Sequence, residues 1–372
     1  MDTCVIAAGA SKASQLAGQQ VVVVGAGVIG LSTAIELRLA GANVTVFTSP
    51  NYPMVSPMAC ALFLPWMGPD SAVLWSGPLE RAVVNSWHRY ESLLNEFGTT
   101  AGIRSATNHE YLGAGDPDPP DRLRSILTPS TISPCNVQFV GNYYDRVWKF
   151  ETIVIDMSCY MSWLGMKALS LGIAIKKQHL ESLSDTFDHE TYVIVNCSGL
   201  GARTLAPDKA VRPVRGQVLF FKPIDQDVLI NFVGIGIGEY CLIPRITDVG
   251  LGSLFEQEID CDEIWPGRSE RNERRLWAAL DALVELSGVD RSALEFSGRT
   301  SVGLRPIREG GYRLEALWHG DRLVVHNYGH GGLGVTVAWG CANQVVDLIR
   351  RELAGTAAGN RGHRRPESLD RG

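Results

Sequence analysis

The first fifty residues hold three apolar segments separated by glycine-containing turns. Val21–Val24 is entirely apolar, Val28–Leu39 is a longer apolar stretch, and Val44–Phe47 is a second short run. Short apolar runs are typical of strands buried on both faces, and the longer stretch has the length of a helix. The pattern therefore predicts a strand, a helix and a strand, the usual opening of a parallel sheet covered by helices.

Later segments differ in their hydrophobic period. The periodicity predicts further elements, namely helices over 77–97, 157–170, 269–287 and 335–353, and strands over 173–175, 192–196 and 322–326. Between 216 and 254, short apolar runs are separated by turn residues, which is typical of an antiparallel sheet.

The order of these elements predicts an α/β fold (α+β overall), in which a Rossmann-like nucleotide-binding domain carries an inserted antiparallel-sheet domain. The first domain is expected to be discontinuous, with the second inserted twice. The expected boundaries are 19–55, 145–210 and 290–354 for the first domain, 56–144 and 211–289 for the second, and 1–18 and 355–372 for flexible tails.

Composition narrows the functional classes. The chain has 372 residues, enough for about two domains. Its net charge is −6 and no long basic run occurs, so nucleic acid is not an expected partner. No apolar run reaches the roughly 20 residues of a transmembrane helix, and the N-terminus lacks the basic region of a signal peptide, so we expect a cytoplasmic protein without a membrane partner. The cysteines are scattered without ligand spacing, so we expect no metal site.

The segment GAGVIG, residues 25–30, follows the first strand and opens the helix. In dinucleotide-binding proteins these glycines permit a tight turn, close approach of a pyrophosphate and packing of the helix on the sheet. An acidic residue usually ends the second strand and binds a ribose hydroxyl. Here Thr48 and Ser49 stand in its place, and their hydroxyls could bond the ribose. The segment indicates a dinucleotide and does not separate FAD from NAD.

A second glycine-rich turn, HNYGHGGLGVT, spans residues 326–336. Gly334, Val335 and Thr336 would aim helix N–H groups at an anion, such as the charge that a reduced flavin gains near N1 and O2. For His326 and His330 we expect structural hydrogen bonds, because metal partners are lacking.

Arg305 precedes a proline in the apolar segment VGLRP. A planar guanidinium can hold a carboxylate through two parallel hydrogen bonds, so Arg305 is a candidate anchor for an amino-acid carboxylate. A structural ion pair is the alternative that the residues alone leave open.

Five segments together resemble the D-amino-acid oxidase family: GAGVIG, NCSGLGA (196–202), RGQV (215–218), VGLRP (302–306) and HNYGHGGLGVT. They occur in the family's order and span roughly Val21 to Ile349, and the last two carry most of the specificity. The resemblance implies an FAD-binding domain, a substrate domain built on an antiparallel sheet, and FAD as the cofactor.

The resemblance also implies the residues of the site. Arg305 matches the carboxylate clamp, which also lies among the flavin contacts, and the carbonyl of Gly332 matches the acceptor for the substrate amine. The positions that match FAD contacts are Gly25, Gly27, Val28, Ile29 and Gly30 in the first turn, Ser56, Ala61 and Leu62 near the pyrophosphate and flavin, Leu180 and Ser198 near adenine, and Gly332, Leu333, Gly334, Val335 and Thr336 at the flavin edge.

Two departures from the family concern the substrate. The family places a tyrosine three residues before the proline of a YIIP-like strand, where this chain has Cys241, with Tyr240 one step earlier. Adjacent strand residues face opposite sides, so either a bulge turns Tyr240 toward the substrate or that carboxylate contact is lost. Leu64 replaces a polar residue near the flavin, and with Phe63 and Trp66 it predicts an apolar pocket wall that prefers uncharged substrates.

The implied activity is oxidative deamination of a D-amino acid, through an imine, to a 2-oxo acid, ammonia and hydrogen peroxide. Flavin N5 would take the hydride, and no side chain is expected to act as an acid or base. The expected partners are the D-amino acid and dioxygen, and a homodimer is left open. Alternatives are an oxidase of glycine, sarcosine or another secondary amine, a tailoring oxidase on a larger amino acid, a flavin-binding protein without catalysis and, more distantly, an NAD-dependent dehydrogenase.

Overall fold

The computed structural model describes residues 16–52, 54–65, 77–116, 118–187, 191–225, 228–232, 240–252, 254–256 and 267–357. The chain divides into two compact units, each built from separate segments. Unit 1 comprises 1–54, 164–212 and 306–372, and unit 2 comprises 55–163 and 213–305.

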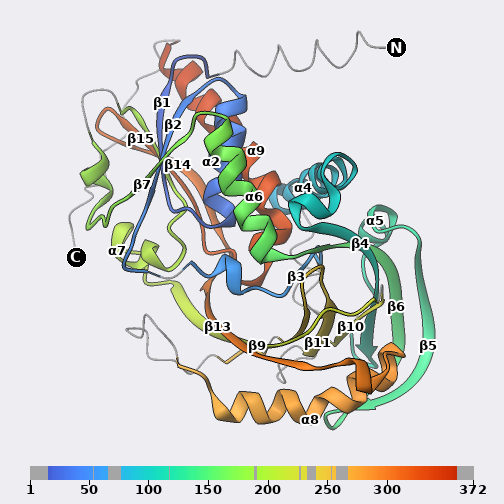
Figure 1. Ribbon diagram of the computed structural model, residues 1–372. Coiled ribbons are helices and arrows are strands. Elements are labelled where there is room, and N and C mark those ends of the chain that lie inside the picture. Colours follow the sequence, from blue (N-terminus) through green and yellow to red (C-terminus); the bar gives the residue numbers. More distant parts are fainter. Residues whose placement is uncertain are drawn as a thin grey trace. The chain divides into compact units, whose positions relative to one another are not determined.

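Unit 1 is built on a six-stranded sheet (Figure 1). Its strands, in spatial order, are β14 (Arg313–His319), β15 (Arg322–Tyr328), β8 (Val193–Asn196), β1 (Gln20–Val24), β2 (Asn43–Thr48) and β7 (Ala174–Lys177). Neighbouring strands are parallel, except that β14 runs antiparallel to β15. Helices α2 (Val28–Leu39) and α9 (Gly334–Ala357) pack side by side in this unit. The short η3 (Leu183–Thr186), η4 (Gly199–Gly201), α7 (Ala202–Leu205) and η6 (Gly331–Leu333) lie in its connections.

Among the described residues, one helical segment, 331–355, which includes most of α9, is long and apolar enough to cross a membrane. Of its most apolar 18-residue stretch, 61% is buried inside the protein. That burial is typical of the core helix of a folded domain.

Unit 2 is built on a nine-stranded, mostly antiparallel sheet. Its strands, in spatial order, are β13 (Phe296–Arg308), β9 (Val211–Phe221), β12 (Val249–Gly252), β11 (Tyr240–Pro244), β10 (Val228–Phe232), β4 (Ile103–Gly113), β6 (Asn142–Ile155) and β3 (Ala61–Leu62), with β5 (Ser130–Phe139) also paired to β6. The helical elements assigned here are η1 (Ser56–Met58), α4 (Gly77–Glu96), η2 (Gly98–Ala101), α5 (Asp121–Ile126), α8 (Glu270–Ser287) and η5 (Arg291–Ala293), while α6 (Met157–Ser170) begins in unit 2 and ends in unit 1.

Around β11, the two faces of the nine-stranded sheet carry different hydrophobic clusters. On one face, which we call the α8 face, Tyr240 and Leu242 pack with Leu276 and Leu280 of α8. On the other, which we call the Cys241 face, the cluster consists of Ala106, Val154, Cys241 and Ile243, with Cys60 and Leu62 packed against it. Side chains of a strand alternate between faces, so β11 separates these two environments.

The expected fold class is confirmed. The helices predicted over 28–39 and 157–170 are confirmed as α2 and α6. Two domain boundaries differ from expectation: those expected at 145 and 290 lie at 164 and 306. The reason is that β6 and most of β13 pair within the nine-stranded sheet. The expected tails are shorter than predicted, because Leu16 is buried and bonded to Ala40, and α9 continues to Ala357.

Candidate functional site

The turn after β1 can only be made by glycine. Gly25 has φ +111°, and its N–H donates to the carbonyl of Phe47 at 2.8 Å. A Cβ on Gly25 would lie 2.4 Å from the carbonyl oxygen of Cys197, and one on Gly30 would lie 1.8 Å from the carbonyl oxygen of Gly25. The turn, the start of α2 and the end of β8 are therefore in close backbone contact.

The N-terminus of α2 is suited to an anion. Gly27 precedes the helix in an extended conformation and makes no side-chain cap, and the first turn of α2 contains no acidic residue. The positive end of the helix dipole thus has no carboxylate beside it. Strand β1 lies between β8 and β2, so the strand order of the sheet reverses at β1. In such sheets, ligands bind at the carboxyl ends of the strands where the order reverses.

The end of β2 brings in a residue that the sequence did not predict. The hydroxyl of Ser49 lies 3.2 Å from Nδ1 of His179 and accepts a hydrogen bond from the N–H of Asn51 at 3.1 Å. The ring of Tyr52 stacks on His179 with centroids 6.0 Å apart. Thr48 ends β2, and its carbonyl accepts from the N–H of Gln178 at 2.9 Å. A polar Ser–His pair therefore stands where an acidic residue is usual, and only the fold brings His179 there.

The two predicted adenine contacts lie at the ends of unit 1 elements. Leu180 is buried in a cluster with Val22 and Val24 of β1. The hydroxyl of Ser198 donates to Oδ1 of Asn196 at 2.6 Å, directly after β8. Both positions lie where β1 and β8 end, as expected for the rim of a nucleotide site.

The second glycine-rich turn connects β15 to α9 through η6, and Gly332, Leu333 and Gly334 lie within it. The first turn of α9 contains no acidic residue. Just before it, His330 stacks on Tyr312 at 4.9 Å, and burial lowers the pKa of His330 to about 3. Its Nε2 is buried and accepts no hydrogen bond within the described part of the chain.

His326 has the structural role that we expected. Its Nδ1 lies 3.4 Å from the side-chain amide of Asn196, which is its register partner on β8. Burial, reinforced by the charge of Arg313, lowers the pKa of His326 to about 3, so the ring is neutral at physiological pH.

Arg305 is held flat between two surfaces of unit 2. A Cβ on Gly216 would lie 2.6 Å from Nη1 and 2.7 Å from both Cζ and Nη2, so the guanidinium lies face-on against this glycine. The ring of Phe255 covers the guanidinium at 3.9 Å. Nη1 donates to the carbonyls of Arg215 at 3.3 Å and Leu254 at 3.1 Å. The plane is thereby fixed, which is the arrangement that bidentate carboxylate binding requires.

The wall that carries Phe255 is itself anchored. Arg215 and Glu256 exchange two backbone hydrogen bonds of 3.0 and 3.1 Å, and their side chains form an ion pair at 3.1 Å. Asn272 of α8 donates to the same carboxylate at 3.0 Å. The carbonyls that bond Arg305 therefore belong to two backbone segments that are fixed to each other.

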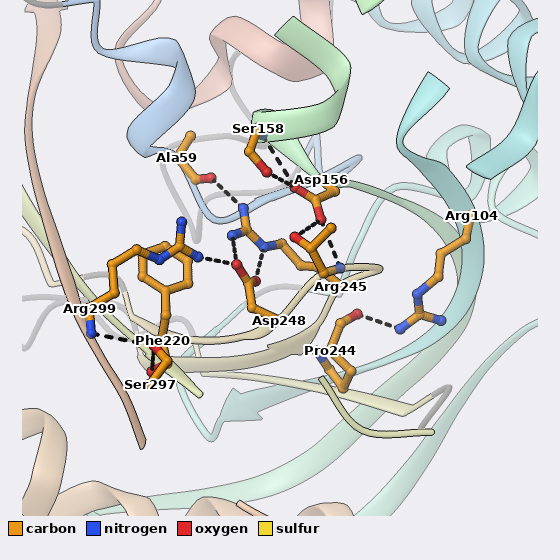
Figure 2. A network of polar contacts seen from close by, with 11 residues as sticks. Ala59, Arg104, Asp156, Ser158, Phe220, Pro244, Arg245, Asp248, Ser297 and Arg299 are labelled. Atoms are coloured by element: carbon orange, nitrogen blue, oxygen red, sulfur yellow. Dashed lines mark hydrogen bonds and ion pairs between the residues drawn. The ribbon is translucent and has the colours of Figure 1, made fainter. Parts of the chain in front are cut away.

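The segment that carries Ser56, Ala61 and Leu62 is attached to the sheet on one side by a buried charge network (Figure 2). Ala61 and Leu62 form β3 and pair with Ile155 and Val154 of β6. Between them and Ser56, the carbonyl of Ala59 accepts a hydrogen bond from Arg245 at 3.3 Å.

Arg245 is placed by Asp248 through hydrogen bonds of 2.6 and 2.7 Å, and both side chains are buried. Arg299 also pairs with Asp248. Asp156, close by, accepts from the N–H and hydroxyl of Thr247 at 3.0 and 2.6 Å. Burial alone would raise the pKa of Asp156, but hydrogen bonds from Ser158 and Thr247 and the charge of Arg245 lower it overall. This network fixes the backbone next to Ala61 and Leu62.

The substrate-facing role expected for Tyr240 does not fit its position. The register runs without a shift from Phe232↔Tyr240 to Ile230↔Leu242, so no bulge occurs there. Tyr240 packs on the α8 face, where its ring meets that of Phe139 at 5.3 Å. Cys241 lies on the opposite face with Leu62.

The expected apolar pocket wall is also smaller than predicted. Phe63 is fully buried and packs edge-on against Trp87 at 5.0 Å and Tyr90 at 6.0 Å, which makes it a core residue. Leu64 is half-buried, and Trp66 lies outside the described residues.

Comparison with known proteins identifies the family of the chain. The family model described as FAD dependent oxidoreductase matches residues 20–348. The chain belongs to this family. A D-amino-acid oxidase of Streptomyces coelicolor is 34% identical over 88% of this chain and 96% of its own length. A D-amino-acid oxidase of Dictyostelium discoideum is 31% identical over 89% and 91%. The crystal structure of glycine oxidase from Geobacillus kaustophilus has the same fold, with a TM-score of 0.68, 16% identity and coverage of 90% and 95%.

As a member of the FAD-dependent oxidoreductase family, the protein uses FAD, as the resemblance implied. The residues present fit this cofactor. The glycine turn at Gly25, the α2 and α9 N-termini without acidic residues, and the unsatisfied nitrogen of His330 together provide backbone donors and a polar group without competing carboxylates. Which of the predicted side chains contact FAD stays a prediction.

Proposed function

We propose that this protein is a D-amino-acid oxidase. The observation that carries the proposal is Arg305, whose guanidinium is held flat between Gly216 and Phe255 with its Nη1 on backbone carbonyls. A cation arranged in this way recognises a planar anion, and the α-carboxylate of an amino acid is such a group. The curated relatives support the same assignment, since the two most similar of those compared above are D-amino-acid oxidases.

Bound FAD supplies the oxidising chemistry by accepting a hydride and passing the electrons to dioxygen. The protein contributes placement. Arg305 binds the substrate carboxylate. Fixing the carboxylate restricts which face of the α-carbon is presented, and therefore which enantiomer reacts. The imine product hydrolyses to a 2-oxo acid and ammonia.

The proposal is tested by purifying the protein, recording its flavin absorption and measuring peroxide release with D- and L-amino acids, glycine and sarcosine. We expect a yellow protein that oxidises D-amino acids. Faster turnover of glycine or sarcosine would favour the secondary-amine alternative, and an FAD-loaded protein that is inactive on the whole panel would favour the non-catalytic one.

Arg305→Ala tests the residue on which the proposal depends. Leaving a buried carboxylate without its partner typically costs about 3–5 kcal/mol, or about two to four powers of ten in kcat/KM. Arg305→Lys should recover only part of this, because an ammonium does not match the planar fork. If Arg305 instead serves the fold, Arg305→Ala lowers thermal stability or flavin content and leaves kcat/KM of the folded enzyme near normal.

Cytoplasmic location stays a prediction, checked by cell fractionation. The homodimer, which the sequence leaves open, is checked by light scattering of the FAD-loaded protein.

A further inference from the structure

Two polar side chains of β4 are buried together. Asn108 and Glu110 are both 0% exposed, and Nδ2 of Asn108 donates to Oε2 of Glu110 at 3.1 Å. Oδ1 of Asn108 is also buried, yet it accepts no hydrogen bond from the part of the chain that the structure describes. A buried acceptor without a hydrogen bond destabilises the folded protein, so a donor is expected at this position.

The strand register places this pair on the Cys241 face. Asn231 of β10 pairs with Cys241 on one side and with Glu110 on the other, so Cys241 and Glu110 lie in one row across the sheet. Residues of a row share a face. Ala106, two positions before Asn108 on β4, packs in the Cys241 cluster, which gives the same assignment independently.

We assign the substrate to the Cys241 face because of the resemblance to the family and the position of Cys241 on that face. Leu62, implied near the flavin, packs in the same cluster, and Cys241 occupies the position where the family has a substrate-binding tyrosine. A cysteine is much smaller than a tyrosine, so this position obstructs a long substrate side chain less. Two strand spacings separate Cys241 from Glu110, about 10 Å between backbones, a distance suited to a long side chain rather than a methyl group.

We propose that Asn108 and Glu110 form the acceptor site for an N–H group at the end of the substrate side chain, so that the preferred substrates are D-amino acids with long basic side chains. The inference rests on the proposed function and deepens it. Both residues present oxygen acceptors, an amide oxygen and a carboxyl group, which an ammonium or guanidinium can satisfy and a carboxylate or alkyl group cannot. It replaces the expectation of a purely apolar pocket, which had relied partly on Phe63.

D-lysine and D-norleucine make the sharpest comparison, because they share the four-carbon chain and differ in the terminal amine. Peroxide release should give D-lysine a kcat/KM at least about tenfold above that of D-norleucine, the discrimination typical of one well-placed charged hydrogen bond. Glu110→Gln and Asn108→Leu should each remove most of this preference while leaving kcat/KM for D-norleucine within about threefold of wild type.

Glu151→Gln is the matched control. Glu151 lies on β6, accepts a hydrogen bond from Thr107 at 2.5 Å, and belongs to the opposite face of the same strand pair. This variant should keep the D-lysine preference. Flavin content and melting temperature of each variant confirm folding.

The outcomes separate the two proposals. A protein that oxidises no D-amino acid contradicts the proposed function. A protein that oxidises D-norleucine as well as or better than D-lysine contradicts this inference alone, as does a preference for D-lysine that survives both substitutions. In that case the acceptor of Asn108 is satisfied by a buried water molecule.

Discussion

Gly216→Ala should damage the carboxylate clamp without removing any of its charges. The added Cβ would lie 2.6 Å from Nη1 of Arg305, whereas ordinary contact begins near 3.4–3.5 Å, so the guanidinium must move by about 0.8 Å. Phe255 lies 3.9 Å behind it and prevents a simple retreat. The guanidinium must therefore tilt or slide in its own plane, away from the hydrogen bonds to Arg215 and Leu254.

A misplacement of about 1 Å in a binding group can lower the rate by about 100-fold. We expect Gly216→Ala to lower kcat/KM for D-amino acids by about 10- to 100-fold, mainly through KM. The affinity for benzoate, measured as a perturbation of flavin absorption, should fall by a similar factor. Overpacking should cost about 1–3 kcal/mol of stability. Gly252→Ala is the control, because its Cβ would meet Val218 at 2.9 Å and not Arg305. Unchanged KM and benzoate affinity in folded Gly216→Ala would refute the arrangement of the clamp described here.

Three further outcomes follow from the geometry. Gly25→Ala should yield protein without FAD, because the new Cβ meets a backbone carbonyl at 2.4 Å, whereas Gly172→Ala, with a similarly positive φ but open space around it, should stay yellow. His326 and His330 have pKa values of about 3 in the folded protein against 6.5 ordinarily. The unfolded chain therefore takes up more protons as the pH falls from 6.5 toward 3, and stability should drop by about 1.4 kcal/mol per pH unit for each histidine. Urea unfolding at pH 5 and 7.5 measures this, and His326→Gln should reduce the slope. Arg245→Met removes two hydrogen bonds from the buried carboxylate of Asp248, which keeps its ion pair with Arg299, so the free energy of unfolding should fall by about 1–3 kcal/mol; an unchanged melting temperature would speak against the network.

The sequence predicted unit 1 better than unit 2 for a physical reason. Central parallel strands are apolar on both faces, so β1 and β8 stand out as uninterrupted runs. The long strands β4 and β6 were missed. In β4 the buried positions include the polar residues Asn108 and Glu110, so the alternation of burial does not appear as an alternation of apolar residues. Which of two adjacent residues faces a site depends on the partner strand, so Tyr240 could not be placed from its own segment.

The clamp was predicted only in part. Arg305 was identified by its neighbours in the chain, but Gly216 and Phe255, which orient it, are distant in sequence. Gly216 lies in the RGQV segment, and nothing in that segment shows that this glycine contacts Arg305. His179 was missed for the same reason, since it reaches Ser49 only through the pairing of β7 with β2.

The interleaving of the two units has a consequence for how the enzyme is made. Strand β15 pairs with β8 inside the nucleotide-binding sheet, and the turn that follows it begins beyond residue 328. A chain emerging from the ribosome therefore lacks this strand and the N-terminus of α9 until nearly all of it has been synthesised. We expect FAD to be captured only after translation is almost complete, so that any fragment ending before residue 322 stays colourless and exposes the apolar edge of β8 to proteases and chaperones.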